Sequence, residues 1–328
     1  MRKLIYMRYA SLDFGSNSTL LLVVHSTEEE PLVENEELFR TTRLASGIDK
    51  TGYLDPDGIR RSLDAAREFL NHLEAQQGPT KGIAAATSAV RDAVNRDLFL
   101  AQTRELLGNP PVLLSGDAEA RTIFAGATSD LEAGLPSIVL DIGGGSTEFA
   151  LGTPGNCESA ASVNAGCVRL AERFGLMDAA DTAAVNAARQ YVRTISKKMK
   201  LQVSDGLAKT GLQPTPAVVV TGGTATTLAA YQQKLTTYDR GIVHGFQSSE
   251  NRVSEILNKL QRMPAAERAK LPGIPTGRAP VWPAGLIIMS EMLRCFDVSN
   301  FRVSTRGLRF GLIQRLIASE LPPTWRTP

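Results

Sequence analysis

A short apolar segment that ends in an aspartate, followed by a turn rich in Gly and Ser and a second apolar segment, occurs twice in the chain. The first copy spans residues 9–24 and carries Asp13, and the second spans residues 138–151 and carries Asp141. Two apolar runs joined by a glycine-containing turn are typical of a β-hairpin. The repetition predicts two related α/β halves, with the boundary between them near residue 126.

Helical and strand patterns alternate along both halves. Apolar residues recur every three or four positions from residue 59 to residue 73, which predicts an amphipathic helix that begins near Asp57. The spacing predicts further helices over residues 95–107 and 179–207. Short apolar runs that read as buried strands lie at residues 82–86, 112–114 and 218–220.

The composition is that of an ordinary globular protein of 328 residues, long enough for two domains. Lys and Arg number 36 against 34 Asp and Glu, a balance that does not favour a nucleic-acid partner. No apolar stretch reaches the roughly 18 residues of a membrane span. The three cysteines lack C-x-x-C spacing, which fits a reducing compartment. We therefore expect a cytoplasmic protein with neither nucleic acid nor membrane as partner.

The turn of the second hairpin has the residues best suited to binding phosphate and a cation. Glycines such as Gly144 and Gly145 let backbone N–H groups approach an anion closely, and the Ser146 hydroxyl adds another donor. Carboxylates beside a bound phosphate hold hard cations, which makes Asp141 and Glu148 candidate metal ligands. Taken alone, the segment also fits a plain glycine-rich hairpin.

The first hairpin offers Asp13 followed by Ser16, Asn17 and Ser18. Any tight turn uses such residues, so this copy is ambiguous by itself. A third Gly-rich turn, residues 221–226, follows the strand predicted at 218–220. Together the three turns favour a phosphate clamp built from two lobes.

Several further blocks occur in a fixed order, namely Thr87–Asn95, Ser115–Arg121, Asn164–Leu170, Val243–Gly245 and Ser304–Gly311. With the turns they resemble the exopolyphosphatase and guanosine pentaphosphate phosphatase family of the actin-like superfamily, from about residue 10 to about residue 313. The resemblance implies an α/β protein with two actin-like (ribonuclease H-like) lobes and a cleft between them. The implied lobes are residues 1–126 and 127–314, followed by a C-terminal tail, 315–328, and we expect the last helix to pack back on the first lobe.

The resemblance also implies an activity, the Mg²⁺-dependent release of terminal phosphate from inorganic polyphosphate or of the 5′ γ-phosphate from guanosine pentaphosphate. Glu119 matches the family's general base, although a Glu in the first turn of a helix also stabilises the helix dipole. Arg91 and Arg278 match arginines that contact phosphate. The expected phosphate ligands are Ser16, Asn17, Ser18, Arg91, Gly144, Gly145, Ser146 and Arg278, and the expected Mg²⁺ ligands are Asp141, Glu148 and Asp13. Mn²⁺ is an expected substitute for Mg²⁺, and a monovalent cation an expected addition.

Three departures from the family pattern bear on whether the chain is catalytic. Ala118 and Phe310 stand where relatives often carry Glu, and Pro280 stands where they carry Asp. These departures are consistent with an alternative function, a sensor that binds polyphosphate or guanosine tetraphosphate without hydrolysing it. An actin-like kinase is the other alternative, although the Glu119 block argues against it. Relatives suggest a homodimer.

Overall fold

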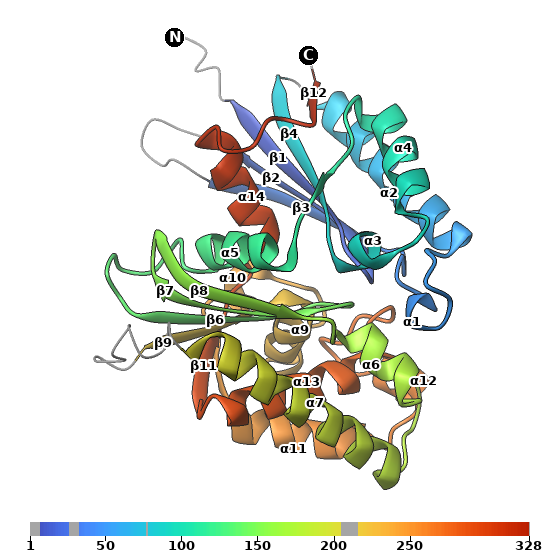
Figure 1. The fold of residues 1–328 in the computed structure, drawn as a ribbon, viewed down its shortest axis with the longest axis vertical. Coiled ribbons are helices and arrows are strands. Elements are labelled where there is room, and N and C mark those ends of the chain that lie inside the picture. Colours follow the sequence, from blue (N-terminus) through green and yellow to red (C-terminus); the bar gives the residue numbers. More distant parts are fainter. Residues whose placement is uncertain (1–6, 26–32, 77, 205–215, 328) are drawn as a thin grey trace. The chain divides into compact units, whose positions relative to one another are not determined.

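The chain folds into two compact units. The first takes in Met1–Ser115 together with Leu308–Pro328, and the second is Gly116–Gly307. The computed structural model, drawn in Figure 1, describes residues 7–25, 33–76, 78–204 and 216–327.

The first unit combines a six-stranded sheet with helices on both faces. Its strands are β1 (Arg8–Phe14), β2 (Ser18–His25), β3 (Val33–Thr41), β4 (Thr80–Ala86), β5 (Val112–Leu113) and β12 (Trp325–Thr327). Its helices are α1 (Ile48–Thr51), α2 (Pro56–Ala75), α3 (Ser88–Asp92), α4 (Arg96–Leu107) and α14 (Leu308–Ile317).

In this sheet the spatial order is β3-β2-β1-β4-β5, with β12 also paired to β4. The strands β1, β2 and β3 form an antiparallel meander, whereas β4 runs parallel to β1 and β5 runs parallel to β4. The expected first hairpin is β1 and β2, with Phe14 opposite Thr19. The C-terminal strand β12 runs antiparallel to β4.

Helix α2 begins where the sequence analysis expects it. The Asp55 side chain accepts a hydrogen bond from the Gly58 N–H, and Pro56 opens the helix with a φ that needs no adjustment. Its buried stripe includes Phe69 and Leu73, which pack with apolar side chains of β1, β2, β4 and α4. Helix α14 covers the opposite face (Figure 1), where Phe310 packs against β2.

The second unit also combines a six-stranded sheet with helices. Its strands are β6 (Ser137–Ile142), β7 (Thr147–Thr153), β8 (Asn156–Val163), β9 (Ala217–Thr221), β10 (Gln247–Ser249) and β11 (Asn300–Val303). Its helices are α5 (Gly116–Ala127), α6 (Cys167–Arg173), α7 (Thr182–Gln202), α9 (Gly222–Gln232), α10 (Arg240–Val243), α11 (Glu250–Leu260), α12 (Ala265–Arg268) and α13 (Trp282–Cys295).

The second sheet repeats the topology of the first. Its order is β8-β7-β6-β9-β11, with β10 added at the edge. Again the first three strands of the unit, β6, β7 and β8, form an antiparallel meander. Strand β9 runs parallel to β6, and β11 runs parallel to β9. Two α/β units with one shared strand order confirm the predicted actin-like (ribonuclease H-like) fold class.

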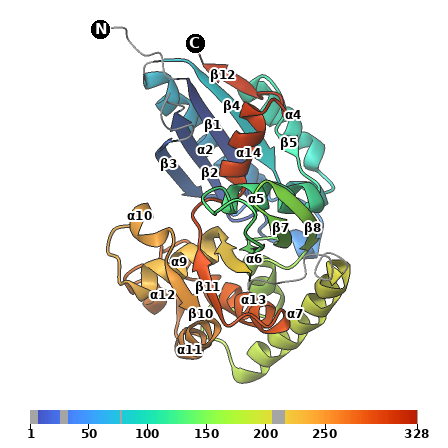
Figure 2. The ribbon, with the colours of Figure 1, turned by 90° about the vertical axis from the view of Figure 1, so that its left-hand side faces the viewer.

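The two faces of the second sheet are covered differently. Helix α13 is buried along nearly its whole length and forms the core of one face with α7 and α11. Helix α5 lies on the other face, along β7 and β8 (Figure 2). None of the helices in the described ranges is long and apolar enough to cross a membrane.

The compact units divide the chain at different positions from the predicted lobes. The predicted lobe I, residues 1–126, includes α5, but α5 packs on β7 and β8 and belongs to the second unit. Lobe II is predicted to end at residue 314, with residues 315–328 as a tail and the last helix packed back on lobe I. In the structure α14 and β12 pack on strands of the first unit, so the chain returns there from Leu308 onward.

The pairing of β12 with β4 generates the first prediction. Trp325 lies over Gly82, where an added Cβ would fall 1.8 Å from Trp325 Cε2. We expect Gly82→Ala to lower the free energy of unfolding by about 1–3 kcal/mol, because the indole must move. Chemical denaturation measures the change.

The matched control is Gly241→Ala. A Cβ there would lie 3.4 Å from the nearest atom, on an α-helical backbone. This variant should be neutral or stabilising by up to about 1 kcal/mol. Equal stability of Gly82→Ala and wild type would contradict the proposed packing of Trp325.

Candidate active site

A row of polar side chains crosses the second sheet at right angles to its strands. The strand register sets Thr221 of β9 opposite Asp141 of β6, Asp141 opposite Glu148 of β7, and Glu148 opposite Ser162 of β8. Residues opposite one another in a ladder project from the same face of the sheet. The predicted cation ligands Asp141 and Glu148 are therefore neighbours in the middle of this row, which we call the acidic row.

The row faces away from the main apolar core. Leu140 and Ile142, which flank Asp141 in β6, both belong to the core formed with α13. Because successive side chains of a strand point to opposite faces, Asp141 and its partners in the row lie on the face that α5 covers. Glu148 is only 2% exposed there.

The start of α5 lies directly on the end of this row. A Cβ added to Gly116 would be 2.6 Å from the Ser162 Cβ, so the absence of a side chain allows this close contact. Glu119 lies three residues later, on the same face of the helix as Gly116, and is 5% exposed. The predicted base therefore lies in the first turn of a helix, as expected, and in the same unit as Asp141 and Glu148.

The glycine loop between β6 and β7 is braced by α6. The carbonyls of Gly143 and Gly144 accept hydrogen bonds from the N–H groups of Cys167 and Val168. Gly166 makes the approach possible, since a Cβ there would lie 2.2 Å from the Gly144 carbonyl carbon. In a trans peptide the N–H points opposite to the C=O, so the N–H groups of Gly144 and Gly145 point away from α6. Such N–H groups can bind a phosphate oxygen.

The Asp141 carboxylate lies against the start of α9. Its Oδ1 atom is buried, has no hydrogen-bond partner among the described residues, and is 2.2 Å from where a Cβ on Gly222 would be. Gly222 has a φ of +84°, which glycine adopts without strain. Desolvation raises the pKa of Asp141 to about 6.

Arg278 packs on the neighbouring glycine. A Cβ on Gly223 would be 2.1 Å from the Arg278 guanidinium carbon, so this residue must also lack a side chain. Burial lowers the pKa of the guanidinium, and the nearby charge of Asp141 raises it. Arg278 is thus a desolvated cation next to Asp141.

The residues predicted from the first hairpin lie in the other unit and are described there by themselves. Ser16, Asn17 and Ser18 are all buried in the turn between β1 and β2. The Ser16 hydroxyl is 3.1 Å from that of Ser88 at the start of α3. Arg91 of the same helix donates to the Leu114 carbonyl at 3.1 Å.

Asp13 lies near the end of β1 and is half-buried. It occupies the position in the first hairpin that Asp141 occupies in the second. Its predicted role as a cation ligand stays a prediction.

Two residues of the family blocks, Phe310 and His244, make contacts that support the fold. Phe310 is 2% exposed and packs with Leu22, Val24 and Ile313, so the aromatic ring at this departure serves the core of the first unit. His244 is 3.0 Å from Asp130 through Nε2 and accepts a hydrogen bond from the Thr305 N–H through Nδ1.

The acidic row fits a hard divalent cation. Side chains opposite each other in an antiparallel pair have Cβ atoms about 5 Å apart, close enough for two carboxylates to share one ion. The buried Asp141 Oδ1 atom also lacks a hydrogen bond. No three His, Cys, Asp or Glu side chains within the described ranges gather into a metal cluster of their own. Mg²⁺ is commonly held by one or two carboxylates, with water and phosphate as the other ligands.

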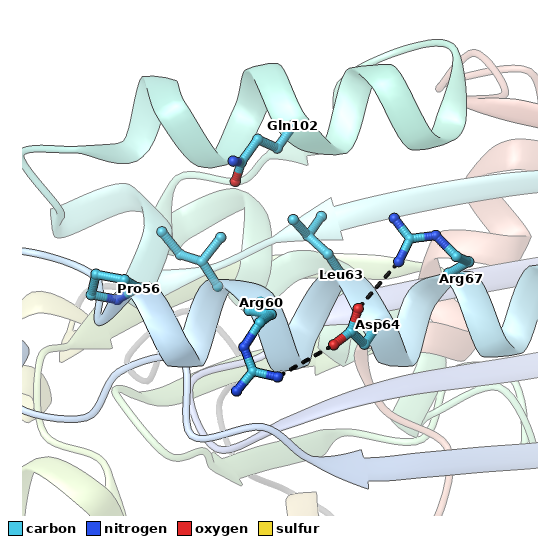
Figure 3. Close-up of a pocket in the computed structure, with 7 residues that line it drawn as sticks. Pro56, Arg60, Leu63, Asp64, Arg67 and Gln102 are labelled. Carbon is cyan, nitrogen blue, oxygen red and sulfur yellow. Dashed lines mark hydrogen bonds and ion pairs between the residues drawn. The ribbon is translucent and has the colours of Figure 1, made fainter.

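A surface groove between α2 and α4 of the first unit is a separate feature (Figure 3). It has a volume of about 250 Å³ and an apolar floor that includes Ile59 and Leu63. Asp64 pairs with Arg60 at 3.7 Å and with Arg67 at 3.1 Å along its rim. Because both arginines already have a carboxylate partner, we assign no phosphate site to the groove.

Comparison with known proteins identifies the family of the chain. The model of the Ppx/GppA phosphatase family matches residues 23–320. The chain belongs to this family. The Ppx/GppA family match takes in the acidic row, the glycine loop and Glu119.

Individual relatives share most of the chain. Exopolyphosphatase 2 of Mycobacterium tuberculosis is 34% identical over 296 residues, which cover 88% of this chain and 90% of the relative. The crystal structure of the Aquifex aeolicus Ppx/GppA family member is 27% identical, with a TM-score of 0.77, and the match covers 96% of this chain and 99% of that one. An exopolyphosphatase from Cytophaga hutchinsonii has the same fold, with a TM-score of 0.80 at 21% identity and coverage of 97% and 99%.

Ser162 is not identified from the sequence, because it belongs to no motif. Gly116 and Gly166 fall within two of the family blocks, but their packing roles appear only in the structure, where each lacks the side chain that would block a close contact.

The Asp141 carboxyl generates a prediction about stability. Because its pKa is raised from 3.8 to about 6 in the folded state, ionisation destabilises the fold as the pH rises through that range. We expect Asp141→Asn to raise the free energy of unfolding by about 1–2 kcal/mol at pH 8 in EDTA. The gain should shrink as the pH falls from 6 toward 4, where the wild-type carboxyl is protonated in the folded state. A gain of equal size at pH 8 and pH 4 would contradict this assignment.

Proposed function

We propose that the protein hydrolyses the terminal phosphoanhydride bond of inorganic polyphosphate. The observation that carries the proposal is the buried face of α5, which brings Glu119 to the sheet face occupied by Asp141 and Glu148. The name of the M. tuberculosis relative, exopolyphosphatase 2, supports the choice of substrate. The same chemistry applies to the 5′ γ-phosphate of guanosine pentaphosphate, which is the second substrate to test.

In the proposed reaction water is the nucleophile and Glu119 is the base. A buried carboxylate on a rigid helix can orient a water molecule and accept its proton as the oxygen attacks phosphorus. The N–H groups of Gly144 and Gly145, with the Ser146 hydroxyl, would hold the oxygens of the phosphate that is attacked.

Charge on the phosphate chain must be neutralised for the leaving group to depart. Arg278 is suited to this, because a desolvated guanidinium binds phosphate through parallel N–H donors. Asp141 and Glu148 would hold Mg²⁺, which supplies further neutralisation and orients the phosphates when bound. Within the first unit, Ser16, Asn17, Ser18 and Arg91 stay proposed phosphate ligands, and Asp13 stays a proposed cation ligand.

The role of Glu119 is tested by Glu119→Gln, which keeps the size of the side chain and removes its basicity. Release of phosphate from medium-chain polyphosphate in Mg²⁺ should fall by a factor of about 10² or more. The matched control is Asp117→Asn in the same helical turn, where the carboxylate is largely exposed and pairs with Arg121 at 2.9 Å. The control should stay within about threefold of wild type.

The outcomes of this assay separate the alternatives. Release from polyphosphate that requires Mg²⁺ and is lost in Glu119→Gln supports the hydrolase. Polyphosphate binding by the wild-type protein without any release would instead favour a sensor. Release that is unaffected by Glu119→Gln would remove Glu119 from the role of base.

Arg278 is tested by Arg278→Ala. We expect the KM for polyphosphate to rise about tenfold or more, because a charge-assisted contact to phosphate is lost. Arg60→Ala is the control, since Arg60 lies at the groove in Figure 3 and already pairs with Asp57 and Asp64. Equal KM values for the two variants would contradict the assignment of Arg278.

A further inference from the structure

Ser162 makes a side-chain hydrogen bond to one of the proposed cation ligands. Its hydroxyl donates to Glu148 Oε1 at 2.7 Å, from the position directly opposite in the β7–β8 ladder. Both side chains project from paired strand backbone, Glu148 from β7 and Ser162 from the edge strand β8. The bond therefore fixes the rotation of a carboxylate that is 2% exposed.

The chemical nature of the donor suits a ligand that must keep its charge. A lysine or arginine in the place of Ser162 would neutralise Glu148 and compete with a cation for it. A hydroxyl donates a single hydrogen bond and carries no charge. Ser162 can therefore orient Oε1 without itself neutralising the carboxylate.

The same serine also supports the helix that carries Glu119. A Cβ on Gly116 would lie 2.6 Å from the Ser162 Cβ and 3.0 Å from its Oγ. Ser162 thus contacts both the start of α5 and the proposed metal ligand, which come from segments far apart in the chain.

We propose that Ser162 is a positioning residue that orients Glu148 for the divalent cation and sets the distance between α5 and the acidic row. The proposal rests on the proposed function, because it assigns Ser162 a role toward the cation that Asp141 and Glu148 would hold. Hydrogen-bond partners of metal ligands typically affect metal affinity by 10- to 100-fold.

The test measures cation binding in the absence of substrate. Mn²⁺ is the probe, and electron paramagnetic resonance counts the free ion as protein is titrated in. We expect Ser162→Ala to weaken Mn²⁺ binding by about tenfold or more. The control is Ser159→Ala on the same strand, because residue 159 faces the opposite side of the sheet from residue 162. It should bind Mn²⁺ within about twofold of wild type.

A second readout separates positioning from general loss of structure. The Mg²⁺ concentration that gives half-maximal phosphate release should rise in Ser162→Ala, whereas the KM for polyphosphate at saturating Mg²⁺ should stay within about twofold of wild type. Should Ser162→Ala fail to fold, Gly116→Ala provides an independent perturbation. It keeps the hydroxyl but displaces the serine, and it should weaken Mn²⁺ binding in the same direction.

The outcomes distinguish this proposal from the one on which it rests. Tight Mn²⁺ binding by wild type and equally tight binding by Ser162→Ala would overturn the role of Ser162 and leave the hydrolase proposal standing. Wild-type protein that binds no Mn²⁺ and releases phosphate in EDTA would overturn the cation site itself, and the role of Ser162 with it.

Discussion

The second unit must accommodate two buried carboxylates, Asp141 and Glu148, held opposite each other on adjacent strands. Like charges at such positions repel, and burial on the α5 face removes the water that would screen them. The surroundings offset part of this cost. Ser162 donates a hydrogen bond to Glu148, Arg278 places a positive charge near Asp141, and the N-terminal end of α9 adds its positive dipole. The raised pKa of Asp141 indicates that these contacts offset only part of the cost of burying its carboxylate.

The fold class could be predicted from the sequence because the two hairpins are local. Each consists of two apolar strands and a glycine-containing turn, so residues within about 16 positions determine it. The limits of the units depend on contacts between distant segments. Helix α5 has an apolar face that could pack on either sheet, and only its fit against Ser162 and β7 assigns it to the second. The apolar residues of α14 likewise do not reveal that their partners are in β2.

Much of the candidate site could also be predicted, for the same reason. The tight turn between β6 and β7 fixes Asp141 opposite Glu148. The next hairpin contains an irregularity at Leu151 and Gly152 that shifts the register by one residue. Counting outward from its turn without that shift would set Ala161 opposite Glu148. A single bulge therefore hides Ser162 from sequence analysis, since its position depends on backbone geometry rather than on residue type.

The return of the chain to the first unit has a consequence for folding during synthesis. Residues 116–307 are continuous, so the second unit can complete its sheet as soon as Gly307 has left the ribosome. The first unit is made earlier but must wait for α14 and β12. Until then the edge of β4 beside Gly82 lacks its antiparallel neighbour, and the apolar surface of β2 lacks Phe310. The half that is translated first is thus the last to finish folding, and its exposed strand edge is where a nascent chain of this architecture is most open to chaperones and to aggregation.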